Sequence, residues 1–248
     1  EQPEIPDSEN LAINRPVEVS GTELDRDQKD FAVDGNRETR WNSNYIKGDH
    51  ASEEAWIIVD LGEETNIIES LTAEYFNLVY PTDYDVLVSA DKENWITAKT
   101  IKNEPNGAAH PTDEISLEPI IGRYVKLLFR ELNSAAVGNC VGLEELTITG
   151  KRISSETELK EYMPISDIKI DKGTSQEELR KLLPLIISGK LALKDSDKIL
   201  DLASLFVNWD LSEYTSAEDT ILTLKGNLIG AGKATGDEIS LNVIIGTG

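Results

Sequence analysis

The sequence predicts an all-β protein made of two β-sandwiches. Short segments rich in Val, Ile, Leu, Thr and aromatic residues follow one another along the chain, and Gly, Pro, Asn or Asp bounds each of them. Helical periodicity is scarce, so many short strands at this spacing favour sandwiches over an α/β fold. In the first part of the chain the expected strands are 55–62, 66–76, 83–91, 94–101, 123–131 and 143–150.

Changes in composition divide the chain. Residues 1–9 are polar, contain two prolines and are expected to form a linker before a domain at 10–150. Residues 151–164 are charged, lack strand alternation and end in proline, so they are expected to be a connector. A second all-β domain follows at 165–248, with strands expected at 165–170, 204–214, 220–230 and 239–245.

One short helix is expected inside the second domain. Ser175 followed by Glu178 is a capping-box pattern, in which each residue satisfies a backbone N–H of the first helical turn. Pro184 then limits the helix to about two turns.

The net charge of the chain limits the classes of partner that it is expected to bind. Lys and Arg number 24 and Asp and Glu number 46, which gives a net charge of −22. This charge repels phosphate backbones and anionic membranes, so neither a nucleic-acid partner nor membrane insertion is expected. Cys140 is the single cysteine, so no internal disulfide can form. The chain begins at Glu1 without a signal-like segment and is expected to be a mature protein or an excised piece.

The segment 31–41 carries the most specific chemistry. Asp34-Gly35 is a tight-turn signal that places the Asp34 carboxylate, the Asn36 carbonyl and the Thr39 hydroxyl in one loop. Calcium takes six to eight oxygen ligands, which loops that bend at glycine bring together. The spacing alone leaves two alternatives open, a calcium site and an ordinary turn.

Six motifs in order resemble a known family. They are NLAINRPVEVSG (10–21), AVDGNRETRW (32–41), WIIVDLGE (56–63), DYDVLVSADKENW (83–95), RYVKLLF (123–129) and LEELTITG (143–150). Together they resemble the discoidin, or coagulation factor V/VIII type C, domain, and within it the bacterial carbohydrate-binding modules of family 32. The resemblance implies a discoidin-type jelly-roll β-sandwich. The motifs LFVNWDLSEY (205–214) and LTLKGNLIG (222–230) resemble a smaller bacterial immunoglobulin-like β-sandwich.

The resemblance implies a structural calcium ion that ties an early loop to the last strand of the first domain. Carried over to this sequence, the ligands are the carbonyls of Phe31, Asn36 and Glu144, the carboxylates of Asp34 and Glu145, and both oxygens of Thr39.

The resemblance also implies a sugar site in loops at one end of the sandwich, with Tyr45 as the expected stacking platform. The family often has a histidine after Trp41 and an arginine in loop 76–82, and this sequence has neither. These departures argue against a simple terminal-galactose site and leave open another hexose, an N-acetylhexosamine or a degenerate site. The expected sugar contacts are Glu23, Asn42, Tyr45, Phe76, Asn77 and Asn139.

Other notable residues are expected to be structural. Trp41, Trp56 and Trp95 lie in strand motifs and are expected in the core, and Trp209 in the core of the second domain. Arg40 is expected to be a partly buried ion-pairing residue. No further ligand surrounds either histidine at zinc spacing, so no zinc site is expected.

Taken together, the sequence predicts a non-catalytic carbohydrate-binding module with structural calcium, a monomeric part of a larger polypeptide. It would tether a secreted or surface glycoside-active bacterial protein to glycans that contain galactose, N-acetylhexosamine or a related sugar. The alternative is an adhesion or protein-binding discoidin domain. An enzyme is disfavoured because no motif singles out the pair of carboxylates that glycoside hydrolysis requires.

Overall fold

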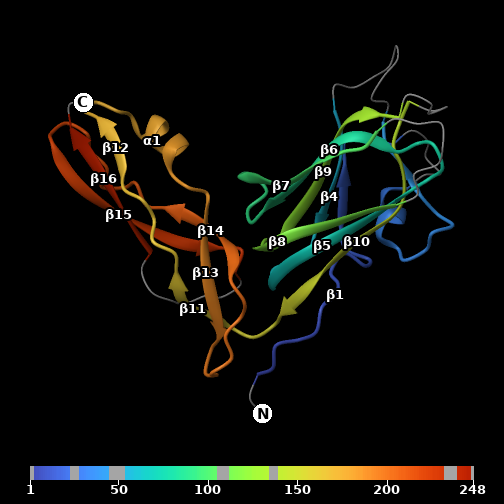
Figure 1. The fold of residues 1–248 in the computed structure, drawn as a ribbon, viewed down its shortest axis with the longest axis horizontal. Helices are drawn as coiled ribbons and strands as arrows, with labels where there is room; N and C mark the ends of the chain where they lie inside the picture. The colour runs from blue at the N-terminus through green and yellow to red at the C-terminus, as the bar shows by residue number, and fades with distance from the viewer. Residues whose placement is uncertain are drawn as a thin grey trace. The chain divides into compact units, whose positions relative to one another are not determined.

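A computed structural model describes residues 3–22, 28–44, 54–104, 112–133, 139–231 and 239–246. The chain divides into two compact units, residues 6–154 and residues 155–248 together with 1–5. The regular secondary structure of the described residues is almost all β, as predicted (Figure 1). The one described α-helix is far too short to span a membrane.

The first unit is a sandwich of two sheets (Figure 1). The first sheet has the order β1-β10-β5-β8, and β3 also pairs with β10; the second has the order β2-β4-β9-β6-β7. The strands of the first sheet are β1 (Glu9–Asn10), β3 (Trp41–Asn42), β5 (Thr65–Tyr75), β8 (Thr112–Ile121) and β10 (Gly142–Ile153). Those of the second are β2 (Val17–Val19), β4 (Ala55–Asp60), β6 (Pro81–Ser89), β7 (Trp95–Lys102) and β9 (Tyr124–Leu132).

The core follows from strand alternation, because successive side chains point to opposite faces of a sheet. On β9, Val125, Leu127 and Phe129 are buried, whereas the residues between them are half-buried. Trp41 is also fully buried, so its expected core position is confirmed.

Sequence analysis missed strand β8. Its glutamates and Pro119 mask the alternation that buries Asp113 and Ile115. Pro119 falls where the β5–β8 register shifts, between the pairs Ile68–Ile120 and Ser70–Ser116. A proline cannot donate to a strand ladder, so such an irregularity is where a strand tolerates one.

Two tryptophans depart from expectation. Trp56 and Trp95 are half-buried on the outer face of the second sheet rather than in the core. The Lys126 ammonium lies 5.1 Å from the Trp56 ring and 5.9 Å from the Trp95 ring. Each indole therefore packs against a lysine, and the cation–π attraction compensates for the exposed aromatic surface.

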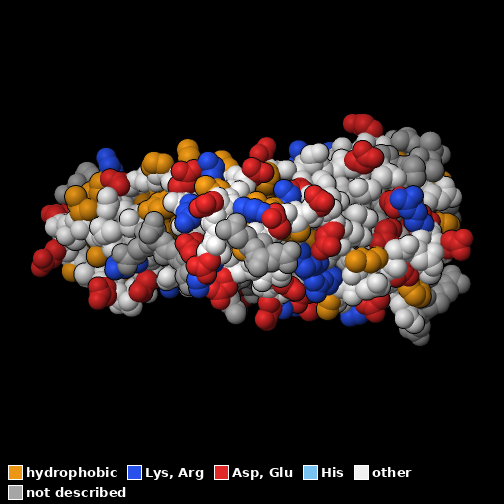
Figure 2. All heavy atoms as spheres, turned by 90° about the horizontal axis from the view of Figure 1, so that it is seen from below, with side chains coloured by type: hydrophobic (Ala, Val, Ile, Leu, Met, Phe, Trp, Pro, Cys, Tyr) orange, Lys and Arg blue, Asp and Glu red, His pale blue; other side chains and the backbone are white. Residues whose placement is uncertain are grey.

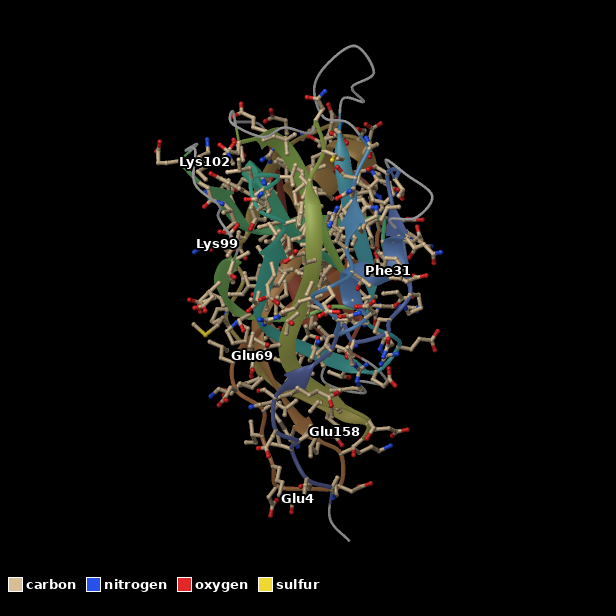
Figure 3. The ribbon with its side chains drawn as sticks, turned by 90° about the vertical axis from the view of Figure 1, so that its right-hand side faces the viewer. Glu4, Phe31, Glu69, Lys99, Lys102 and Glu158 are labelled. Atoms are coloured by element: carbon tan, nitrogen blue, oxygen red, sulfur yellow. The ribbon has the colours of Figure 1, made fainter. Side chains whose placement is uncertain are left out.

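Strand β7 forms an edge of the second sheet. The register with β6 shifts between Val86–Lys99 and Leu87–Thr97, which makes Ala98 an extra, bulged residue. Lys99 and Lys102 are exposed on this strand and both are labelled in Figure 3.

The second unit is built on strands β11 (Thr157–Tyr162), β12 (Ile168–Asp171), β13 (Ile186–Leu193), β14 (Ala203–Trp209), β15 (Thr220–Ile229) and β16 (Ile239–Gly246). They pair in the order β11-β13-β14-β15-β16-β12, with β12 and β16 parallel. Trp209 is buried as predicted, and its indole N–H donates to the Pro184 carbonyl at 2.8 Å.

Two local predictions in this region have different outcomes. The capping box is confirmed, because Ser175 and Glu178 bond to each other's backbone N–H at the start of helix α1 (Gln176–Leu182). The prediction of a connector without strands at 151–164 is wrong, since β10 extends to Ile153 and β11 follows. Thr157 and Leu159 are buried at alternate positions of β11, and its pairing with β13 satisfies the backbone despite the charged residues between them.

Acidic side chains are spread among basic ones over the surface seen in Figure 2, rather than gathered in one tract. In the first unit several form ion pairs that link neighbouring strands. The Arg123 guanidinium on the β9 side donates to both carboxylate oxygens of Asp60 on β4, at 2.8 and 2.9 Å. These hydrogen bonds hold the pKa of Asp60 below its usual value.

Replacement of Asp60 tests this link. A lowered native pKa means that the ionised form stabilises the fold above the unfolded pKa of about 4, and that this stabilisation is lost as pH falls through the native pKa. We expect Asp60→Asn to lower the free energy of unfolding by about 1 kcal/mol at pH 7, and the difference from wild type to vanish at low pH. Urea titrations at several pH values measure it. The control Glu63→Gln, at a largely exposed partner of Arg123, should change little, and an equal loss in both variants would contradict the assignment.

Candidate functional site

The segment 31–41 forms a closed loop around Asp34. The 3-10 helix η1 (Lys29–Val33) leads into it, and Gly35 takes a positive φ of 78° that suits glycine. Asp34 accepts hydrogen bonds from the Asn36 N–H at 2.8 Å and from the Thr39 hydroxyl at 2.8 Å. The Thr39 hydroxyl also lies 2.7 Å from the Asn36 carbonyl. Three of the predicted oxygen ligands therefore lie together.

A bulge in β10 brings Glu145 to this loop. Leu143 pairs with Tyr75 but Glu145 pairs with Glu74, so Glu144 is an extra residue in the strand. Leu143 and Leu146 are both buried in the core although three positions separate them. The bulge thereby places Glu145 on the opposite face from Leu146, where the Gly35 N–H donates to its carboxylate at 3.0 Å.

The environment of Glu145 is unusual for a carboxylate. The residue is only 4% exposed, and its Oε1 is buried without a hydrogen-bond partner. Burial, together with the charges of Asp34 and Glu74, raises the pKa of Glu145 to about 7. Arg37 pairs with Glu74 at 2.8 Å rather than with Glu145. An orphaned, buried carboxylate oxygen beside other oxygen ligands is the setting that a cation would stabilise.

Four of the predicted metal ligands, Asp34, Asn36, Thr39 and Glu145, thus lie at one loop and offer oxygen atoms of the kind that calcium binds. Among the described residues no three His, Cys, Asp or Glu side chains gather as ligands, so the set depends on carbonyl and hydroxyl oxygens as well. Phe31 lies half-buried in η1, on the segment beside the sheets in Figure 3, and Glu144 is half-buried at the bulge.

The structure brings two of the predicted sugar contacts together around Gly142. Gly142 of β10 pairs with Asn42 of β3, and its carbonyl accepts from the Phe76 N–H at 2.8 Å. A side chain at position 142 would meet Asn42 Oδ1 at 3.0 Å and Phe76 Cβ at 3.2 Å, so glycine leaves room between them. We call Arg40, Asn42, Phe76 and Gly142 the Phe76 cluster.

Phe76 is the side chain of the cluster that faces solvent, with 37% of its surface exposed. The Arg40 guanidinium lies over its ring, 3.8 Å from the ring centroid. Arg40 is half-buried as expected, but it forms no ion pair with the described residues; Glu144 interacts with it only electrostatically, and its Nε is buried without a hydrogen-bond partner. Sequence analysis missed this stack, since ring and guanidinium come from segments far apart in the chain.

The remaining predicted sugar contacts differ in how far their side chains are exposed. Asn42 is only 7% exposed, so its side chain is largely covered. Asn77 is exposed next to Phe76 with a positive φ of 50°, and Asn139 is half-buried before β10. Glu23 and the expected platform Tyr45 lie outside the described residues.

The buried residue Ser43 stabilises the Phe76 cluster through hydrogen bonds. The Ser43 N–H donates to the Val141 carbonyl at 2.9 Å, and the Val141 N–H donates to the Ser43 hydroxyl at 3.0 Å. That hydroxyl donates in turn to the Asn44 carbonyl at 2.7 Å. These bonds join the end of β3 to the segment before β10, and so fix the distance between Asn42 and Gly142.

Comparison with known proteins supports what this geometry indicates. The sequence profile of the F5/8 type C domain matches residues 16–145, more than half of the chain. The chain belongs to the F5/8 type C domain family. The match begins before the Asp34 loop and ends at Glu145, so both the loop and the bulge lie in the F5/8 type C domain.

Individual relatives are more distant. The chain is 28% identical over 205 residues to the polysaccharide lyase 8 family protein HylA of Enterococcus faecalis, a match that covers 79% of this chain but 12% of HylA. A chitosan-binding module of a Paenibacillus chitosanase/glucanase, solved with chitotriose, is 26% identical with a TM-score of 0.46, covering 56% of this chain and 98% of the module. The module CBM32-3 of a Clostridium perfringens family 31 glycoside hydrolase is 21% identical with a TM-score of 0.48, covering 58% and 95%.

Removal of the Ser43 hydroxyl tests the fastening of the cluster. Ser43→Ala leaves the buried Val141 N–H without its partner, which costs about 1–3 kcal/mol. We therefore expect calorimetry to show a lower melting temperature for the F5/8 type C unit of this variant. Ser8→Ala removes an exposed hydroxyl that bonds Glu69 and should change the free energy of unfolding by less than about 0.5 kcal/mol. Equal stabilities of the two variants would contradict the role of Ser43.

Proposed function

We propose that residues 6–154 form a non-catalytic carbohydrate-binding module whose sugar site includes the Phe76 cluster. The observation that carries this proposal is the exposed Phe76 ring beside the Arg40 guanidinium and the exposed Asn77. A sugar ring has an apolar face and a rim of hydroxyls, so it is bound by an aromatic surface flanked by a few polar groups. Tyr45 and Glu23, which lie outside the described residues, remain proposed sugar contacts.

The comparisons support a role for the module within a larger protein that acts on polysaccharide. HylA is named as a polysaccharide lyase family protein, and the chain spans a small part of its length. We propose that the module tethers a larger secreted or surface glycan-active protein, because a tether raises the effective concentration of a linked domain at its substrate. A single site of this kind binds weakly, with a dissociation constant of roughly micromolar to millimolar.

We also propose that the Asp34 loop binds calcium as a structural ion. The buried, orphaned Oε1 of Glu145 supports this assignment, as do the hydrogen bond from Gly35 that holds Glu145 at the loop and the contact between the Asp34 and Thr39 oxygens. Bound calcium would neutralise the carboxylates and tie the loop to β10 in a domain without a disulfide. The proposed ligands are Phe31, Asp34, Asn36, Thr39, Glu144 and Glu145.

For the second unit we propose an immunoglobulin-like spacer. The buried Trp209 supports this assignment.

A glycan array tests sugar binding. We expect the full chain, in calcium buffer, to bind a defined class of glycans, and Phe76→Ala to abolish this signal by removing the exposed ring. Ile221→Ala, which truncates a 66% exposed apolar side chain of the other unit, is the matched control and should bind as wild type does. A blank array with folded wild-type protein would refute sugar binding and favour the protein-binding alternative.

Calcium titration tests the metal site. A ligand that binds only the folded state at a hundredfold excess over its dissociation constant adds about 2.7 kcal/mol. We expect calcium to raise the melting temperature of wild type and chelator to lower it, whereas Glu145→Gln should respond to neither. Glu38→Gln changes an exposed carboxyl of the same loop that is not a proposed ligand, and should keep the wild-type response. A melting temperature of wild type that ignores both additions would exclude the site.

A further inference from the structure

Arg40 is an exception among the described arginines of the first unit. The others each form an ion pair with a carboxylate within 4 Å: Arg15, Arg37, Arg123, Arg130 and Arg152. Arg40 has none among the described residues, although the chain carries an excess of 22 negative charges. Glu144 acts on Arg40 electrostatically without forming an ion pair with it, so the half-buried guanidinium keeps part of its desolvation cost unless a ligand supplies an anion.

From this we infer that Arg40 makes the Phe76 cluster selective for saccharides that carry a carboxylate. The inference rests on the sugar-binding function proposed above and names the class of sugar. The carboxylate would take the place of the missing protein partner of Arg40, while the sugar ring contacts Phe76.

The stack on Phe76 suits this role. A guanidinium packed over an aromatic ring keeps its N–H donors in its own plane, where they remain able to bond a planar carboxylate by two parallel hydrogen bonds. The Arg40 Nε is buried and unpartnered, so the terminal amino groups are the donors left for a ligand. The ring also holds the guanidinium in place, which reduces the conformational entropy that binding would otherwise cost.

The charges around the Arg40–Phe76 stack favour a ligand with one anionic group over a ligand with many. Arg37, three residues earlier, already bonds Glu74 at 2.8 Å, and Glu144 lowers the local potential near Arg40. A phosphate chain or a densely sulfated polymer would meet the general negative field of the chain. A sugar that bears a single carboxylate would meet the aromatic ring and Arg40, which has no ion pair among the described residues, and it requires no basic patch.

The test compares two matched ligands, the methyl glycosides of glucose and of glucuronic acid, which differ in one carboxylate. We expect isothermal titration calorimetry or NMR titration of the full chain in calcium buffer to show about tenfold tighter binding of the acid, because its carboxylate adds a charge-assisted hydrogen bond to Arg40. Added salt should reduce this preference. In Arg40→Gln the ratio of the two dissociation constants should fall to about one, with Arg40→Lys between the two.

Arg37→Gln is the control, because it removes a neighbouring arginine that already has a partner, and it should keep the wild-type ratio. Circular dichroism and the melting temperature establish that each variant is folded. Equal binding of the two glycosides by wild type, or an unchanged ratio in Arg40→Gln, would overturn the inference while leaving sugar binding intact. Failure of folded wild type to bind either glycoside, together with a blank array, would instead refute the proposed function itself.

Discussion

The extra residue in β10 is the constraint on which the functional end of the first unit depends. Without the bulge at Glu144, Leu143 and Glu145 would point to the same face, and either a leucine would leave the core or a carboxylate would enter it. With it, the strand buries Leu143 and Leu146 and still delivers Glu145 to the Asp34 loop. The same strand start, at Gly142, positions Asn42 and Phe76. Core packing, the proposed cation site and the candidate sugar surface therefore share five consecutive residues, 142–146.

The negative charge of the chain is distributed so that it does not disrupt this arrangement of strands and loops. In the first unit Arg123, Arg130 and Arg152 pair with carboxylates of neighbouring strands, and these ion pairs link the strands across an acidic surface. Two groups stand outside this pattern, an acid without a cation at Glu145 and a cation without an acid at Arg40. The proposals of a structural calcium ion and of an acidic sugar ligand rest on these two groups of the described residues.

Local chemistry made most of the fold predictable from sequence. Alternation located β4, β6 and β9, and the Ser175–Glu178 pair located helix α1, because these signals act within a few residues. Strand β8 was missed since its proline sits at a register shift that only the partner strand defines. The Asp34 turn was visible, but the approach of Glu145 across 110 positions came only from a family resemblance. The Arg40–Phe76 stack was not foreseeable, because no local pattern distinguishes an ion-paired arginine from a stacked one.

The free edge at β7 has a consequence for how densely such a protein can be displayed. Among the described residues of the first unit no strand covers its outer side, and an uncovered strand with a regular ladder recruits other chains. The bulge at Ala98 interrupts that ladder, and Lys99 and Lys102 place charge along it. A neighbouring copy that approached edge to edge would meet mismatched donors and like charges. The edge is therefore protected against aggregation, even where many copies are crowded together and no disulfide is present to resist strand exchange.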